Sequence, residues 1–253
     1  MMGTILGDEK QPQAQVDELR ERVQPLLNLS APADALVAYY ALYHSPTRSA
    51  LYVHLNRHAL PDGFVAVCQT GQRLFQPVVA LRTVDAAAAV ALLRRALVPG
   101  RPYYLVTTPD LRDAAGEVLQ IARPELNHIY ELDLAQFEPV INVLVMAEGS
   151  ATSAPRFVIR SQGEIAAEAG INWQSPHFAE MYVATQPAAQ GRGWGRSVAA
   201  ACTQWVIQSG RRPLYVVEAG NARSIALAEA LGYRDTGARE YAGEGVCLLP
   251  VAP

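Results

Sequence analysis

The feature that most constrains this 253-residue chain is an order of predicted elements that occurs twice. In each half three strand-like runs come first, and a helix, a strand, a second helix and a last strand follow. The first set is predicted at residues 50–55, 64–69, 73–81, 85–97, 103–107, 111–122 and 128–134, after two helices within residues 13–44. The second set is predicted at residues 156–160, 164–173, 178–185, 195–209, 214–218, 221–231 and 246–249. Because the halves share this order without evident sequence identity, we expect an α/β protein that arose by a divergent internal duplication.

The segment between the halves, residues 148–155, reads EGSATSAP. It is rich in small and polar residues and ends in proline, which is typical of a linker. We therefore predict a first domain at residues 1–147, a linker at 148–155 and a second domain at 156–253.

Composition excludes several classes of function. Half of the residues are apolar and 18% are charged, so the chain can bury a sizeable core. The net charge of −3 leaves no excess of basic residues for a phosphate backbone, and we expect no nucleic-acid partner. No run approaches about 18 uninterrupted apolar residues, and residues 1–10 lack the pattern of a signal peptide. These features predict a cytoplasmic protein without a membrane partner, for which an oligomer is possible but not indicated.

The cysteines and histidines give no sign of a metal site or of disulfides. Cys68, Cys202 and Cys247 are far apart and form no Cys-x-x-Cys pair, as expected in a reducing compartment. The five histidines show no ligand spacing. We expect no bound metal.

One segment predicts a binding site for phosphate. Residues 190–196 read Gln-Gly-Arg-Gly-Trp-Gly-Arg and lie between a predicted strand and a predicted helix. The alternating glycines allow successive backbone N–H groups to turn toward one anion, and the helix start and two arginines add positive charge. A P-loop would need Lys followed by Ser or Thr, which the segment lacks. A dinucleotide-binding turn is disfavoured because Arg196 stands where a small residue is required.

The same residues resemble a known family. Gln190-x-x-Gly193-x-Gly195, after a strand that ends at Thr185, is similar to the acetyl-CoA signature of the GNAT superfamily of N-acetyltransferases. Residues 221–233 resemble the next motif of that family. The resemblance covers about residues 155–249, whereas the first half matches only in its order of elements and has no glycine between Leu81 and Asp85. It implies two GNAT-like halves, each a central mixed, mostly antiparallel twisted sheet flanked by helices, of which the first is degenerate and lacks the phosphate loop.

The resemblance also implies an activity and a set of binding residues. The activity would be acetyl-CoA-dependent N-acetyl transfer, by direct attack of a primary amine on the thioester, with a small-molecule amine as acceptor. Acetylation of a protein N-terminus or lysine, and a non-catalytic acyl-CoA-binding sensor, are the alternatives. The residues implied to bind the co-substrate acetyl-CoA are Val183, Ala184, Thr185, Gln190, Gly191, Arg192, Gly193, Trp194, Gly195, Arg196, Ser197, Asn221 and Ser224.

Candidates for proton transfer are fewer. Glu180, on the strand that leads into the glycine segment, is the candidate general base, although an outward-facing strand carboxylate fits the pattern equally well; His177 is the alternative base. Many family members carry a tyrosine acid at the position of Ala228, so Tyr233 and Tyr241 become the candidate acids. Cys202, in the middle of a predicted helix, is not expected to act as a nucleophile.

Overall fold

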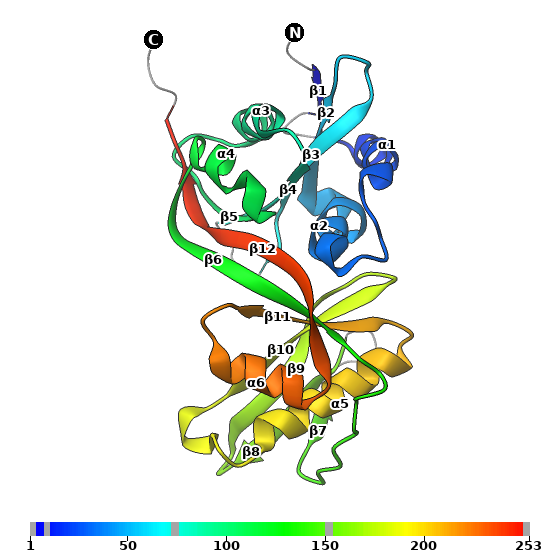
Figure 1. The fold of residues 1–253 in the computed structure, drawn as a ribbon, viewed down its shortest axis with the longest axis vertical. Coiled ribbons are helices and arrows are strands. Elements are labelled where there is room, and N and C mark those ends of the chain that lie inside the picture. Colours follow the sequence, from blue (N-terminus) through cyan, green and yellow to red (C-terminus); the bar gives the residue numbers. More distant parts are fainter. Residues whose placement is uncertain (1–3, 8–10, 72–75, 150–153, 250–253) are drawn as a thin grey trace. The chain divides into compact units, whose positions relative to one another are not determined.

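The computed structural model describes residues 4–7, 11–71, 76–149 and 154–249, which form two compact units. Unit 1 comprises residues 1–127 and 239–253, and unit 2 comprises residues 128–238. Two long strands, β6 (Leu119–Leu132) and β12 (Tyr233–Cys247), lie side by side and contribute to both units (Figure 1). The units therefore do not follow the predicted boundaries at residues 147 and 156. Of the predicted linker, Glu148 ends strand β7, and residues 150–153 lie outside the described residues.

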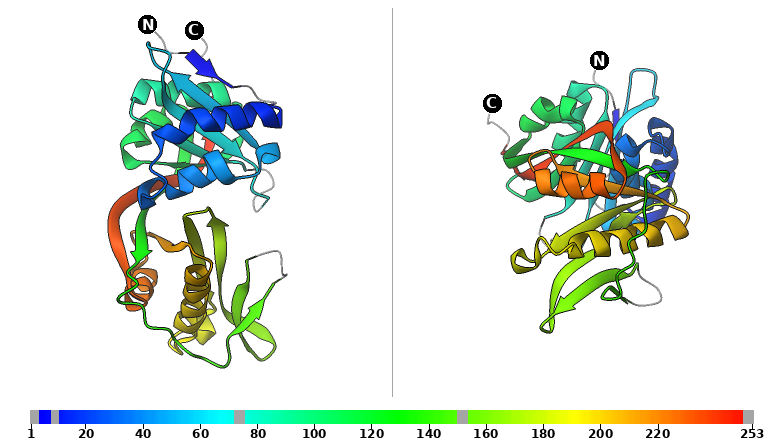
Figure 2. Two further views of the ribbon diagram at one scale, coloured as in Figure 1. Left: turned by 90° about the vertical axis from the view of Figure 1, so that its right-hand side faces the viewer. Right: turned by 60° about the horizontal axis from the view of Figure 1, so that its bottom comes forward.

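Unit 1 is a mostly antiparallel sheet with helices on both faces. Its strand order is β1-β2-β3-β4-β5-β12-β6, and β4 and β5 are parallel. The remaining strands and the α-helices are β1 (Thr4–Leu6), β2 (Ser49–Leu55), β3 (Pro61–Cys68), β4 (Val78–Thr83), β5 (Pro102–Thr107), α1 (Gln13–Val23), α2 (Ala35–Ala38), α3 (Ala86–Ala96) and α4 (Arg112–Gly116). Side chains alternate between two cores, so that Leu51 and Val53 pack with α1 and α2 while Tyr52 packs with α3 and α4. Figure 2 shows α1 on the opposite side of the strands from α3 and α4.

Unit 2 has a sheet of the same kind with its α-helices on one face. Its strand order is β12-β6-β11-β10-β9-β8-β7, and β10 and β11 are the parallel pair. The elements are β7 (Met146–Glu148), β8 (Arg156–Ser161), β9 (Glu164–Gln174), β10 (Phe178–Thr185), α5 (Trp194–Gln208), β11 (Arg212–Glu218) and α6 (Ala222–Ala230). Both helices pack on one core that includes Met181, Val198 and Tyr215. None of the α-helices in the described parts of the chain is long and apolar enough to span a membrane.

Each sheet is completed by a strand from the other half of the sequence. In unit 1, β12 lies between β5 and β6, with antiparallel pairs from Tyr241↔Thr107 to Val246↔Pro102. In unit 2, β6 lies between β11 and β12. The sequence predicts much shorter strands at 128–134 and 246–249, and a helix at 111–122 that in fact ends at Gly116.

The predicted fold class is confirmed. Both halves contain a mixed, mostly antiparallel sheet with flanking helices, in the repeated order of three strands, helix, strand, helix and strand. The short strands β1 and β7, of three residues each, were not predicted. The predicted strand at 73–81 begins at Val78 within the described residues, while residues 72–75 lie outside them.

Candidate functional site

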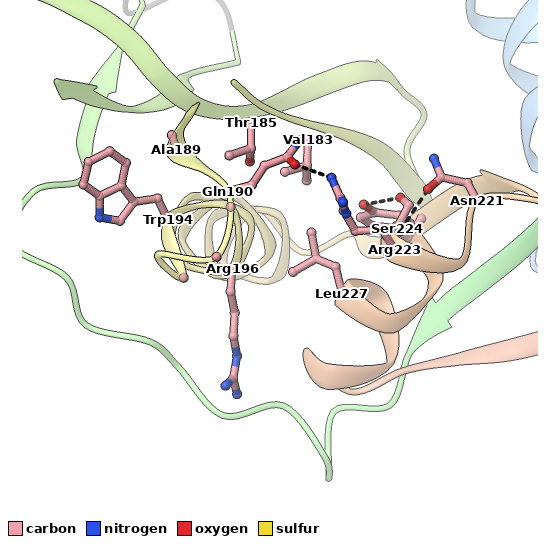
Figure 3. Close-up of a pocket in the computed structure, with 14 residues that line it drawn as sticks. Val183, Thr185, Ala189, Gln190, Trp194, Arg196, Asn221, Arg223, Ser224 and Leu227 are labelled. Atoms are coloured by element: carbon pink, nitrogen blue, oxygen red, sulfur yellow. Dashed lines mark hydrogen bonds between the residues drawn. The ribbon is translucent and has the colours of Figure 1, made fainter. Parts of the chain in front are cut away.

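The site in unit 2 begins where two parallel strands separate. The ladder between β10 and β11 runs from Phe178↔Arg212 to Met181↔Tyr215 and then ends, while β10 continues to Thr185 with β9 as its neighbour. A cavity of about 660 Å³ opens beside this gap (Figure 3). It is lined by Val183, Thr185, Ala189, Gln190, Gly191, Gly193, Trp194, Gly195, Arg196, Tyr215, Asn221, Arg223, Ser224 and Leu227. The exposed edge of β10 is therefore one wall of the cavity.

The start of α5 is another wall, and its backbone donors are not capped by a side chain. Asp85 caps α3 and Asn221 caps α6 by accepting backbone N–H groups, whereas the residue before α5 is Gly193, with φ of 75°. The first N–H groups of a helix have no partner within it, and the helix dipole makes this end positive. The turn before α5 is thus suited to hold an anion.

The three glycines in this turn are required for two different structural reasons. Gly191 and Gly193 have φ of 79° and 75°, a left-handed conformation that side chains disfavour. Gly195 allows a close approach, because a Cβ atom there would lie 2.7 Å from Thr185 Oγ1. The glycines therefore fix both the turn and the contact between α5 and β10.

The charge of the cavity is positive. Among the residues that the structure describes, its lining contains Arg196 and Arg223 and no carboxylate. Arg223 donates a hydrogen bond from Nη1 to Gln190 Oε1, which joins α6 to the turn before α5 (Figure 3). Arg196 has no hydrogen-bond or ion-pair partner among the residues that the structure describes, and in Figure 3 it extends away from Gln190. The cavity therefore favours an anionic ligand.

Ten of the thirteen residues predicted to bind the co-substrate line this cavity, and three do not. Ala184 alternates with Val183 and Thr185 and is exposed. The guanidinium of Arg192 lies over the Trp194 ring, 5.0 Å from its centroid. Ser197 is buried, where it donates to Gly193 O (3.2 Å) and accepts a hydrogen bond from Asn142 (3.0 Å).

Four lining residues were not predicted from the sequence: Ala189, Tyr215, Arg223 and Leu227. Arg223 lies within the second motif, and its place beside the capping Asn221 could have indicated it. Leu227 is also within that motif. Tyr215 lies on β11, where no motif indicates a binding residue, and its hydroxyl is 2.8 Å from Ser224 Oγ.

Glu180 is buried on the other face of the sheet from α5. Met181 packs in the core under α5, so the alternation of β10 directs Glu180 to the opposite face, and its side chain is 9% exposed. A bulge in β9 sets Asn172 and Trp173 opposite Glu180, and both donate hydrogen bonds to its carboxylate, at 2.7 and 2.5 Å. Burial raises the pKa of Glu180 and the two hydrogen bonds lower it, with burial the larger effect. The carboxylate is thus held in a fixed position and is more basic than an exposed one.

The other candidates for proton transfer do not line the cavity. His177 is exposed in the turn between β9 and β10. Tyr233 is fully buried, with its hydroxyl 2.9 Å from Thr203 Oγ1 and donating to Met181 Sδ, and burial raises its pKa. Tyr241 belongs to unit 1 and packs in the core there. Cys202 is buried within α5, and burial raises the pKa of its thiol to about 12.

The equivalent region of unit 1 is closed. The ladder between β4 and β5 extends to Ala80↔Val106, and beyond it Thr107 Oγ1 donates to Leu81 O (3.1 Å), which holds the strands together. The Asp85 carboxylate occupies the start of α3, where unit 2 has Gly193. Within the described residues no group of three or more His, Cys, Asp or Glu side chains is arranged to hold a metal ion.

Comparison with known proteins supports the resemblance. Residues 160–242 match the model of the FR47-like protein family. No curated protein matches the sequence. Among solved structures, the chain is similar to a GNAT-family acetyltransferase from Novosphingobium aromaticivorans, with 18% identity, 73% and 89% of the two chains covered and a TM-score of 0.57.

Two further similar structures cover nearly the whole chain. One is a tandem GNAT protein from the clavulanic acid biosynthesis pathway, with 11% identity, 99% and 100% coverage and a TM-score of 0.61. The other is a GCN5-related N-acetyltransferase from Sphaerobacter thermophilus, with 10% identity, 98% and 97% coverage and a TM-score of 0.61. The chain therefore has the GNAT fold in both halves.

Proposed function

We propose that unit 2 binds acetyl-CoA and transfers its acetyl group to the primary amine of a small molecule. The observation that carries this proposal is the cavity at the gap between β10 and β11, where an uncapped helix start and two arginines meet and no carboxylate lies among the described lining residues. Coenzyme A combines an anionic pyrophosphate with a pantetheine chain that carries amides. The cavity offers a fitting group for each: backbone N–H groups and arginines for the phosphates, and an open strand edge for the amides.

The residues of this chain would divide the binding as follows. The N–H groups from Gly191 to Arg196 would hold the pyrophosphate, as at other helix N-termini that bind phosphate. The free edge of β10 at Val183 and Thr185 would pair with the pantetheine amides as an added strand does. When bound, acetyl-CoA supplies a thioester, whose carbonyl carbon is open to attack by an amine.

Glu180 is the proposed base for that attack. It precedes Met181, the last residue of β10 that pairs with β11, and it faces the side of the sheet without α5 and α6. An amine that reaches the gap from this side would give its proton to Glu180 directly or through a water molecule. Because the Cys202 thiol is buried and its pKa is high, the proposal contains no acyl-enzyme intermediate.

The test is a thiol-release assay with acetyl-CoA and a panel of amines: amino acids, polyamines, aminoglycosides and short peptides. We expect release of coenzyme A with at least one small amine, and stabilisation of the fold against heat by acetyl-CoA but not by NAD. A ligand at 100 times its dissociation constant adds about 2.7 kcal/mol of stability. Release with peptides alone would indicate a protein acetyltransferase. Stabilisation without any release of coenzyme A would indicate a sensor. The absence of both stabilisation and release would refute the proposal.

A further inference from the structure

Tyr215 lines the proposed coenzyme site but has no role in the binding described above. It is the one tyrosine among the described residues that line the cavity. Its side chain is held firmly, because it is 4% exposed, its ring meets that of Tyr233 edge-on with centroids 5.7 Å apart, and its hydroxyl is 2.8 Å from Ser224 Oγ. The ring therefore directs one hydroxyl to a fixed point at the cavity wall.

The position of Tyr215 in the sheet is as specific as its contacts. Met181↔Tyr215 is the last pair of the parallel ladder, so Tyr215 lies where β10 and β11 begin to separate. Its hydroxyl contacts Ser224 in the first turn of α6, and Ala228 follows one helical turn later, fully buried. Residues four apart lie on one face of a helix. Tyr215 thus brings a phenol from the strand to the face of α6 on which Ala228 offers no polar group.

We infer that Tyr215, positioned by Ser224, donates the hydrogen bond and the proton that the departing sulfur of coenzyme A requires. The inference rests on the proposed function. In the reaction the C–N bond forms at the thioester carbon and the C–S bond breaks with its electron pair on sulfur. The proton of Tyr215 goes to that sulfur, and the phenolate recovers a proton from Ser224, which is half-buried and recovers its own from water. The proton lost by the amine goes to Glu180 or to water.

The surroundings keep Tyr215 protonated at neutral pH. Burial raises its pKa above the ordinary value, and the hydrogen bond with Ser224 opposes this effect less strongly. Besides Tyr215, the ionisable side chains that line the cavity are those of Arg196 and Arg223; among the described residues its lining includes no histidine, lysine, cysteine or carboxylate. A pH dependence of coenzyme binding near the thiol pKa therefore reports on the thiol itself.

The test compares the binding of coenzyme A and desulfo-coenzyme A to the whole protein by calorimetry, from pH 7 to pH 10. In the wild type we expect a lowered pKa of the bound thiol, because a donor stabilises the thiolate. Tyr215→Phe should raise that pKa and weaken binding of the thiolate form by roughly ten-fold or more, the size of a hydrogen bond to a charged group. It should leave the affinity for desulfo-coenzyme A unchanged. Ser224→Ala should also raise the pKa of the bound thiol and weaken binding of the thiolate form, but by less than Tyr215→Phe does.

Tyr233→Phe is the matched control. It also removes a hydroxyl from a buried tyrosine, but Tyr233 does not line the cavity, so the ratio of the two affinities should not change. If Tyr215→Phe lowered the affinity for coenzyme A and for desulfo-coenzyme A equally, or left the thiol pKa unchanged, the inference would be overturned while the proposed function stayed intact. Failure of the wild type to bind coenzyme A at all would instead refute the proposed function.

Discussion

Two arginines flank the glycine turn before α5, and their surroundings differ. Arg196 lines the cavity and has no partner among the described residues, whereas Arg192 lies over the ring of Trp194. We expect Arg196→Ala to weaken coenzyme A binding by about 1.5–3 kcal/mol, as the loss of a charged hydrogen bond does. Arg192→Ala is the matched control and should change the affinity little. Calorimetric titration checks both, and equal losses would show that the cavity lining does not define the phosphate site.

Glu180 gives a prediction about pH. A base acts only when it is deprotonated, so the rate should rise with pH through the pKa of Glu180, which burial raises above that of an ordinary carboxyl. Glu180→Gln keeps the size of the side chain and removes the base, so kcat should fall by about 10²–10⁴-fold and this limb of the profile should disappear. Acetyl-CoA affinity should not change, because Glu180 does not line the cavity. An unaltered pH–rate profile in the variant would assign the base to water.

At the scale of residues, spacing alone predicts much of the candidate site. The alternation of glycines and the helix start locate the turn, because both depend on neighbouring residues only. The different surroundings of Arg192 and Arg196 depend on the direction in which α5 leaves the turn, which the sequence does not specify. The same limit applies to Glu180, since the bulge in β9 that brings Asn172 and Trp173 to it is a property of strand pairing.

At the scale of elements, the role of the turn before α5 in binding can be distinguished from the backbone strain that any side chain at a left-handed position causes. Gly193 has φ of 75°, and Gly163, between β8 and β9, has φ of 84°. At both positions a Cβ atom would meet no other atom within 4 Å. Replacing either by Ala should cost about 1–2 kcal/mol of stability, the penalty for a side chain in the left-handed conformation. We expect only Gly193→Ala to weaken coenzyme A binding as well. Thermal unfolding and calorimetry on both variants check this, and intact binding in Gly193→Ala would contradict the role of the turn.

Elements defined by local pattern were predicted well, and those defined by distant partners were not. Strand β10 was predicted at its observed limits, and α5 and α6 within one residue at each end. Strand β12 contains three glycines and several charged residues, so its own propensity is low and its length comes from pairing with β5 and β6. Pairing between strands more than a hundred residues apart leaves no local signature.

At the scale of the whole molecule, the two halves should bind coenzyme A unequally. In unit 1 the hydroxyl of Thr107 closes the gap between β4 and β5, and the Asp85 carboxylate repels an anion at the start of α3. We therefore expect one coenzyme A per chain. Titration calorimetry on the full chain measures the stoichiometry directly, and two equivalent sites would show that unit 1 is not degenerate.

Because β6 and β12 each contribute to the sheets of both units, truncation at one end of the chain should affect the unit formed by the other end. Removing residues 239–253 deletes the part of β12 that pairs with β5, so unit 1 should lose its cooperative unfolding although residues 1–127 remain. Hydrogen exchange at β5 is the measurement, with the full chain as reference. Tyr104 N–H donates to Pro77 O on the β4 side, so alternation directs the Leu105 and Thr107 amides toward β12. Protection of these two amides that survives the truncation would show that unit 1 folds without its last strand.

Strand β12 also sets the order of events on the ribosome. Unit 1 contains residues 1–127, yet the strand that completes its sheet is synthesised more than a hundred residues later. At typical rates of translation, about 120 further residues take roughly 6–24 s to appear. During that interval the edge of β5 that later pairs with β12 has no partner strand. Unpaired strand edges can pair with other chains. A protein built in this way finishes its first half only when its second half has emerged, so nascent chains of this kind are expected substrates for chaperones that shield exposed strands.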